Sequence, residues 1–164
     1  MGEEWNRCVV ALGANLGDRA HTAFEALADL RATEGFRVVG ESSLRETVAL
    51  TSSGPDPDAP GYLNQVILLD SAWSPEHTLQ ALLDIERAHG RQRTGQQYAN
   101  RTLDLDLITY GDLTWNTPSL SVPHPRAHER RFVLEPWAEI EPEAVLRGHG
   151  PIASLLAALP DGSP

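Results

Sequence analysis

Two aspartates stand at alternate positions in the stretch RTLDLDLITYG, residues 101–111. In an extended segment, Asp104 and Asp106 share one face, together with Ile108, and the leucines at 103, 105 and 107 share the other. Side chains two apart in a strand are separated by roughly 6.6 Å, so the two carboxylates repel each other. A divalent cation with oxygen ligands would neutralise that repulsion, and so would water on an exposed face. The stretch therefore predicts either a metal site or the wet face of an edge strand.

Arginines gather in two segments of a chain whose formal net charge is −10 and which contains no lysine. Segment 87–101 holds four arginines and no acid, and segment 124–132 holds three arginines, two histidines and one acid. The planar guanidinium suits phosphate oxygens, so the two segments predict a pocket for a small polyanion. Surface salt bridges are the alternative. The absence of lysine excludes a Walker-type phosphate loop, and the net charge argues against a nucleic-acid surface.

The whole chain has the length and composition of one globular domain. Its 164 residues suffice for a proper core, and 41% of them are hydrophobic. No apolar run approaches the length of a membrane span, and the first residues do not form a signal peptide. The single Cys8 rules out a disulfide framework within the chain. We expect a reducing, cytoplasmic location and no membrane partner.

A helix is expected over about residues 18–33, after a buried strand at 8–15 that ends in a Gly-Ala-Asn turn. Asp18 is the expected N-cap, and Gly35 is expected to end the helix. The expected apolar stripe consists of Ala20, Ala23, Phe24, Leu27 and Leu30.

A second helix is expected over residues 74–90, with Ser74 as N-cap, Pro75 in the first turn and Gly90 past its end. Its apolar stripe runs through Leu79, Leu82 and Leu83 and then meets Glu86. Glu86 therefore lies on or beside the core-facing side, where a carboxylate needs a partner. A salt bridge to an arginine and a contact to a nucleotide are equally good explanations.

Further strands are expected from residue 36 onward and at 62–72, with a loop at 51–61 and a short helix in the tail. The order strand, helix, strand, strand, helix, strand predicts an α+β fold. Its expected form is a ferredoxin-like sandwich, a mainly antiparallel sheet with helices packed on one face. The core is expected to span about 8–146 of a single domain at 1–164, with the short helix and tail at 150–164.

The chain resembles the 6-hydroxymethyl-7,8-dihydropterin pyrophosphokinases of folate biosynthesis. Six motifs in the family's order carry the resemblance: ALGANLGDR (11–19), YLNQV (62–66), IERAHGRQR (85–93), RTLDLDLITYG (101–111), VPHPR (122–126) and RRFVLEPWAEIEP (130–142). The resemblance implies a monomeric enzyme whose substrates are ATP and hydroxymethyldihydropterin, and it implies one pyrophosphokinase domain. The pterin hydroxymethyl oxygen would attack the β-phosphorus of ATP, and AMP would leave.

The resemblance also implies roles for individual residues. Asp104 and Asp106 match the pair that holds two Mg²⁺ ions, and Arg91 and Arg101 match arginines that assist the transfer. The positions that match ATP contacts are Glu86, Arg91, Arg93, Tyr98, Arg101, Leu107, Ser121, His124 and Arg130. The positions that match the pterin site are Gly13, Thr47, Val48, Leu50, Tyr62, Asn64 and Phe132. Of these, Tyr62 and Phe132 would stack on the pterin, and the Asn64 amide would read its edge.

Three departures from the family pattern fall near the substrates. Tyr98-Ala99-Asn100 stands where many members have Trp-Gly-Pro, Val48-Ala49 stands where many have Pro-Pro, and Pro125 replaces an aromatic. They bear on loop closure and affinity more than on the chemistry. The alternatives are a phosphohydrolase on the same fold, which needs no pterin slot, and a non-catalytic binding module, which needs no paired aspartates. A nucleic-acid module is the weakest alternative.

Overall fold

A computed structural model describes residues 4–15, 18–47, 49–51, 54–56, 61–89 and 103–160. Its central sheet consists of five strands: β1 (Asn6–Ala14), β2 (Phe36–Glu41), β3 (Arg45–Thr47), β6 (Tyr62–Ser71) and β7 (Leu103–Tyr110). The strands lie in the order β2-β6-β1-β7, and β3 continues the pairing along β6 beyond β2. Every pairing in this sheet is antiparallel. This order, with a helix after the first and third long strands, confirms the ferredoxin-like α+β fold.

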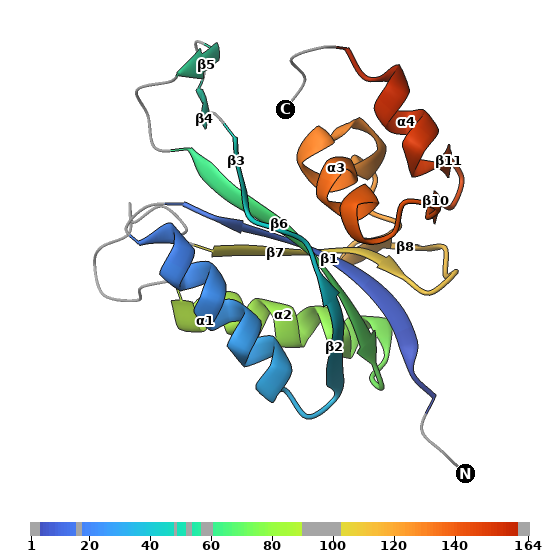
Figure 1. Cartoon of the computed structure of the whole chain (residues 1–164). Coiled ribbons are helices and arrows are strands. Elements are labelled where there is room, and N and C mark those ends of the chain that lie inside the picture. Colours follow the sequence, from blue (N-terminus) through green and yellow to red (C-terminus); the bar gives the residue numbers. More distant parts are fainter. Residues whose placement is uncertain are drawn as a thin grey trace.

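Helices cover both faces of the sheet, so the expectation of helices on one face was wrong (Figure 1). Helices α1 (Arg19–Ala32) and α2 (Pro75–His89) pack on one face, against the β1 side chains at positions 8, 10, 12 and 14. Helices α3 (Arg131–Ile140) and α4 (Ile152–Ala158) pack on the other face. The sequence around α3 hid this helix because Pro136 lies inside it, where proline removes a backbone hydrogen bond. Burial of Val133, Leu134 and Trp137 compensates for that loss.

The N-caps of the first two helices are as the sequence predicted, and Gly90 lies outside the described residues. The Asp18 side chain accepts a hydrogen bond from the His21 N–H, and the Ser74 hydroxyl accepts one from the His77 N–H. The predicted stripe of α1 was partly wrong, because Phe24 is 71% exposed and the buried residues are Ala23, Ala26, Leu27 and Leu30. Ala20 is also exposed.

Two turn assignments also need correction. The C-cap of α1 is Thr33 and not Gly35. Glycine is required at position 35 for a different reason, because a Cβ there would lie 2.3 Å from the Trp73 ring. The strand β1 continues through Gly13 and Ala14, which we expected to begin a turn.

Smaller elements complete the described chain. They are the paired strands β4 (Ala49–Thr51) and β5 (Gly54–Asp56), β8 (Trp115–Thr117) and β9 (Leu120–Val122), β10 (Val145–Leu146) and β11 (Gly150–Pro151), and the 3₁₀ turn η1 (Ala127–Glu129). The segment expected to be a loop at 51–61 thus contains part of a hairpin, and β3 follows β2 where a loop was expected. The Val122–Pro123 peptide bond is cis. Within the described ranges, no helix is both long and apolar enough to cross a membrane.

Candidate active site

The two faces of β7 differ as the sequence predicted. Its leucines at 103, 105 and 107 are buried in the core beneath α1 and α2, each at most 4% exposed. Asp104 and Asp106 lie on the opposite face, where the Asp106 side chain is 44% exposed. Both carboxylates line a cavity, so they lie neither in the core nor on a plain outer surface.

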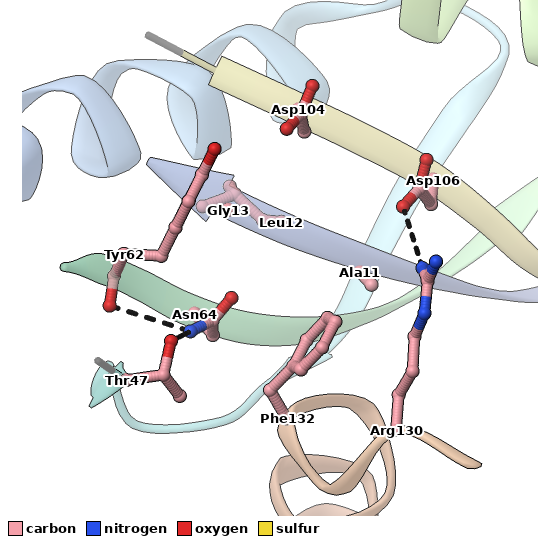
Figure 2. A pocket seen from close by; sticks show the side chains of 10 residues that line it. All are labelled: Ala11, Leu12, Gly13, Thr47, Tyr62, Asn64, Asp104, Asp106, Arg130 and Phe132. Atoms are coloured by element: carbon pink, nitrogen blue, oxygen red, sulfur yellow. Dashed lines mark hydrogen bonds and ion pairs between the residues drawn. The ribbon is translucent and has the colours of Figure 1, made fainter. Parts of the chain in front are cut away.

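This cavity, called the slot below, has a volume of about 250 Å³ and opens on the sheet face that α3 covers only in part (Figure 2). Its residues come from all three central strands, from β3 and from the start of α3. They are Ala11, Leu12, Gly13, Thr47, Tyr62, Asn64, Asp104, Asp106, Arg130 and Phe132. The structure thereby brings together eight predicted site residues, and it adds Ala11 and Leu12. Four other predicted residues that the structure describes do not line the slot: Glu86, Leu107, Ser121 and His124.

Small residues of β1 form the floor of the slot. In the strand pairing, Gly13 lies between Asn64 of β6 and Asp104 of β7, and Ala11 lies opposite Asp106. A Cβ on Gly13 would meet the Asn64 Oδ1 at 3.5 Å and the Tyr62 ring at 3.6 Å. The space above β1 therefore stays open because its two inward residues there have little or no side chain. Sequence reasoning missed Ala11, since only the cross-strand register shows which β1 residues face the aspartates.

Asn64 forms one wall of the slot and is held in a fixed orientation. It is 6% exposed, and its Nδ2 donates to the Thr47 hydroxyl at 2.9 Å and to the Tyr62 carbonyl at 3.5 Å. Those bonds direct the amide nitrogen toward β3 and leave Oδ1 beside Gly13. A flat heterocycle in the slot would meet a preset acceptor and the Tyr62 ring.

The opposite wall comes from the start of α3. Figure 2 shows Phe132 facing Asn64 across the slot, and Arg130 reaching from α3 toward Asp106. The Arg130 Nη1 lies 3.9 Å from the Asp106 Oδ2, and its guanidinium lies 5.5 Å from the Phe132 ring centre. The Arg130–Asp106 pair links α3 to the carboxylate face of β7. Both side chains retain solvent access, at 26% and 44%, so each can change partner.

Glu86 lies on the far side of β7, at its outer edge. The side chain is buried, with 4% exposed, and its Oε2 accepts the Leu105 N–H at 2.7 Å. The peptide that it holds lies between the two aspartates, so Glu86 fixes the backbone from which both carboxylates project. This backbone amide is a partner in addition to the arginine or nucleotide that the sequence suggested, and those two contacts stay predictions.

A second cavity, called the edge cavity below, lies along the same edge of β7 and has a volume of about 270 Å³. Its lining includes the predicted residues Glu86, Leu107, Ser121 and His124, together with Asp106. Residues missed by sequence reasoning also line it: Leu79, Leu83, Leu105, Ser119 and Leu120. Pro125, one of the three departures from the family pattern, lines it as well. The slot and the edge cavity therefore meet at the Asp106 carboxylate.

His124 is fixed at this junction by its own backbone and ring. Its N–H donates to the Ile108 carbonyl at 2.8 Å, which satisfies the outer edge of β7. Its Nδ1 accepts the Arg126 N–H at 3.2 Å, so the neutral ring carries its proton on Nε2. Burial lowers the pKa of His124 below its usual range, and Arg126 and Arg130 act in the same direction while Asp106 opposes them. At neutral pH, His124 is therefore a neutral hydrogen-bond donor.

The described residues contain no cluster of three or more metal-ligating side chains. The pair Asp104 and Asp106 nevertheless suits Mg²⁺, which binds through one or two carboxylates and completes its shell with water and substrate phosphates. Val48, Arg91, Arg93, Tyr98 and Arg101 lie outside the described residues, as does the side chain of Leu50. Their predicted roles stay predictions.

Comparison with known sequences identifies the family. Residues 9–142 match the model of the family described as 7,8-dihydro-6-hydroxymethylpterin-pyrophosphokinase (HPPK). The chain belongs to the HPPK family. The family is a pyrophosphokinase family that uses ATP, and its reaction transfers pyrophosphate to hydroxymethyldihydropterin in folate biosynthesis.

Two bacterial relatives are named 2-amino-4-hydroxy-6-hydroxymethyldihydropteridine pyrophosphokinase. The protein of Synechocystis sp. is 38% identical over 87% of this chain and 70% of its own length. That of Methylorubrum extorquens is 35% identical over 87% of each chain. A mitochondrial folate synthesis bifunctional protein of Pisum sativum is 37% identical, but this chain spans only 24% of its length.

Solved structures agree on the fold. An HPPK-DHPS crystal structure superposes with a TM-score of 0.72 at 13% identity, covering 93% of this chain and 43% of the other. The wild-type HPPK-DHPS of Plasmodium falciparum gives a TM-score of 0.69 at 14% identity, covering 95% of this chain and 45% of the other. The chain thus spans less than half the length of these solved proteins.

Proposed function

We propose that this HPPK chain binds its pterin in the slot and its ATP in the edge cavity, so that the two substrates meet at Asp106. The observation that supports this arrangement is that both cavities are lined by the same carboxylate. A transfer between two bound substrates requires neighbouring sites with a shared point for the reacting phosphate.

The slot suits a planar, polar bicycle. Tyr62 and Phe132 supply aromatic faces, and the buried Asn64 supplies an amide already oriented by Thr47. Gly13 and Ala11 leave the floor low enough for a ring to lie against the backbone of β1. Thr47, Gly13 and the backbone near Val48 and Leu50 would complete the contacts to the pterin edge.

The edge cavity suits a nucleoside with its phosphates directed toward Asp106. Leucines from α2 and β7 offer apolar contact, and Ser121 and the His124 ring offer polar contact. Arg130 lies beside Asp106, and its guanidinium can exchange the contact with that carboxylate for one with a phosphate oxygen. Glu86 contributes by holding the Leu105 amide, and Arg91, Arg93, Tyr98 and Arg101 are proposed to complete the phosphate contacts.

Asp104 and Asp106 would hold Mg²⁺, with two ions expected. When bound with ATP, the metal neutralises the phosphate charge that develops during transfer. The protein's own groups then orient the reactants. The slot directs the pterin hydroxymethyl oxygen toward the β-phosphorus, and that oxygen forms a new P–O bond as the bond to the α-phosphate oxygen breaks. AMP departs with the electron pair of the broken bond, and the proton of the hydroxymethyl group passes to solvent. The neutral His124 can donate a hydrogen bond from its Nε2 to a phosphate oxygen.

We further propose that residues 1–164 act as one pyrophosphokinase domain with its core at about 8–146, and that the enzyme works as a cytoplasmic monomer. The experiment that tests the reaction is product identification after incubation with ATP, Mg²⁺ and 6-hydroxymethyl-7,8-dihydropterin. The expected products are AMP and the pterin diphosphate, with AMP formed only when the pterin is present. ADP or free phosphate would instead favour the metal-dependent hydrolase, and omission of Mg²⁺ with excess chelator tests the metal requirement.

A further inference from the structure

A carboxylate on α3 makes an unusually dense set of contacts with the segment that leads to the slot. Glu139 accepts the Ser43 N–H at 2.9 Å and the Ser43 hydroxyl at 2.8 Å. It also accepts the Arg45 Nη2 at 2.9 Å. The Arg45 Nη1 reaches a second carboxylate of the same helix, Glu135, at 3.2 Å. We call Ser43, Arg45, Glu135 and Glu139 the clamp.

The clamp connects the two walls of the slot. Arg45 begins β3, which ends at Thr47, the partner of the Asn64 amide. Glu135 and Glu139 belong to α3, whose second residue is Phe132. A small cavity of about 80 Å³ lies between these elements, and Thr47, Asn64 and Phe132 line both it and the slot. Arg45 and Glu135 of the clamp line this small cavity as well, so the clamp borders the space directly behind the Thr47–Asn64 wall of the slot.

The opposite side of β3 is anchored separately. Side chains alternate along a strand, so Glu46 points away from the face used by Arg45 and Thr47. Glu46 pairs with Arg19 of α1 at 2.7 Å, and the same Arg19 nitrogen donates to the Gly61 carbonyl at 2.7 Å. These contacts hold β3 to the α1 side of the sheet. They do not reach α3, whereas Arg45 of the clamp joins β3 to that helix directly.

The Glu139 carboxylate of the clamp is stabilised in its ionised form by the groups that bond to it. Bonds from Ser43 and Arg45 lower the pKa of Glu139, with the Ser43 backbone amide as the largest cause, so the group is an anion at neutral pH. None of the clamp's four members lines the slot, so none is placed to touch the substrate.

From these contacts we propose that the clamp is a positioning device that sets the distance between the Thr47–Asn64 wall and Phe132, and thereby the affinity for the pterin. The proposal rests on the assignment of the slot to the pterin. Substrate affinity would depend on the clamp because stacking and edge contacts require both walls at a fixed separation. Binding of ATP in the edge cavity would depend on it much less, since no clamp residue lines that cavity.

The test compares Arg45→Met and Glu139→Gln with Arg31→Met. The control breaks a more exposed ion pair far from the slot, Arg31 Nη2 to Glu41 Oε1 at 2.7 Å, between α1 and β2. Weakening the charge-assisted contacts behind the wall should raise the KM for the pterin about tenfold in each of these two clamp variants. The KM for ATP and kcat should stay within about twofold, and the control should match wild type in all three. Ser43→Ala removes only the hydroxyl bond and should give an intermediate rise of about threefold.

Direct binding separates the clamp from the assignment of the slot. The pterin's own fluorescence, titrated with folded protein in the absence of ATP, gives its Kd for wild type and for each variant. If wild type binds no pterin, the assignment of the slot fails. If wild type binds and both clamp variants bind equally well, the clamp proposal is overturned. A parallel rise in the KM for ATP, or an equal effect in Arg31→Met, would also overturn it. Thermal melting identifies any variant that is unfolded, and Ser43→Ala then replaces it.

Discussion

The two faces of the sheet are built on the same strands but are covered differently. Beneath α1 and α2, the leucines of β7 and the inward residues of β1 form one continuous apolar core. On the other face, α3 and α4 cover Val9, Val66 and Ile108, but the strand ends that carry Gly13, Asn64 and Asp104 line a cavity instead. The difference teaches that the candidate site lies where helix cover ends. The same alternation that buries leucines on one face of β7 leaves its two aspartates lining an open cavity on the other face.

The largest effect is expected from the carboxylates of the open face. Asp104→Asn and Asp106→Asn should each lower kcat/KM by about a thousandfold or more, because each removes a charged oxygen proposed to hold Mg²⁺. The melting temperature should stay within about 4 °C of wild type, since partly exposed side chains seldom change stability by more than about 0.5 kcal/mol. Steady-state kinetics and calorimetry on the same samples check both numbers. Full activity in either variant would contradict the metal assignment.

The opposite pattern is expected from the neighbouring residue on the covered face. Leu103 is 2% exposed and lines neither the slot nor the edge cavity, and Leu103→Ala should lower the free energy of unfolding by about 2–5 kcal/mol through lost burial and a new cavity. Because the Leu105 amide and its bond to Glu86 are retained, kcat per folded molecule should fall by less than about tenfold. Denaturant titration and assays well below the melting temperature measure the two quantities. A loss of activity as large as that of the aspartate variants would contradict the view that residues of the covered face act on stability and those of the open face on activity.

Glu86 sharpens the comparison because it is a buried acid at the edge between the faces. Glu86→Ala leaves the Leu105 N–H without its acceptor and should cost about 1–3 kcal/mol of unfolding free energy. Glu86→Gln keeps an oxygen at that position and should cost less than half as much as the alanine variant. Denaturant titration of both variants, with activity measured in parallel, tests whether the hydrogen-bond acceptor or the charge matters. Equal destabilisation by both would mean that the negative charge itself is required.

Much of this contrast could be predicted from local patterns. The period-two alternation of β7, the caps at Asp18 and Ser74 and the order of long strands and helices are local signals, and each was confirmed. The placement of α3 on the second face could not be predicted, because Pro136 obscures the helical pattern and only tertiary burial stabilises it. The prediction that Phe24 belongs to the buried stripe of α1 was wrong for a related reason. The apolar residues of α1 are too evenly spread around the helix to indicate which side faces the sheet.

The candidate site was predictable to the extent that it depends on residue types in sequence order. Asn64, Tyr62, Phe132 and the two aspartates come from distant segments, and the structure brings all five to the slot. Ala11 gave no signal because a small residue in a strand is ordinary until its cross-strand neighbour is known to be Asp106. The backbone partner of Glu86 was missed for the same reason, since a backbone amide leaves no trace in the sequence.

The smallest effect is expected from pH and concerns the ion pairs of the clamp on the open face. The pKa of Glu139 is lowered in the folded protein, chiefly by the Ser43 amide and then by Arg45, whose other contact is Glu135. A lowered folded-state pKa adds stability above the unfolded value, about 4.3 for glutamate, and that stability is lost as pH falls through the folded pKa. The difference in unfolding free energy between wild type and Glu139→Gln should therefore be constant near neutral pH and shrink below about pH 4.3.

Denaturant titrations of both proteins at a series of pH values measure that difference. Arg31→Met again serves as the control, because it removes a different ion pair, Arg31 to Glu41, and leaves Glu139 with all of its partners. A difference between wild type and Glu139→Gln that stays constant down to pH 3 would mean that the ionised carboxylate adds nothing. The clamp would then hold the two walls through its neutral hydrogen bonds alone, and the covered and open faces would differ in polarity but not in their dependence on charge.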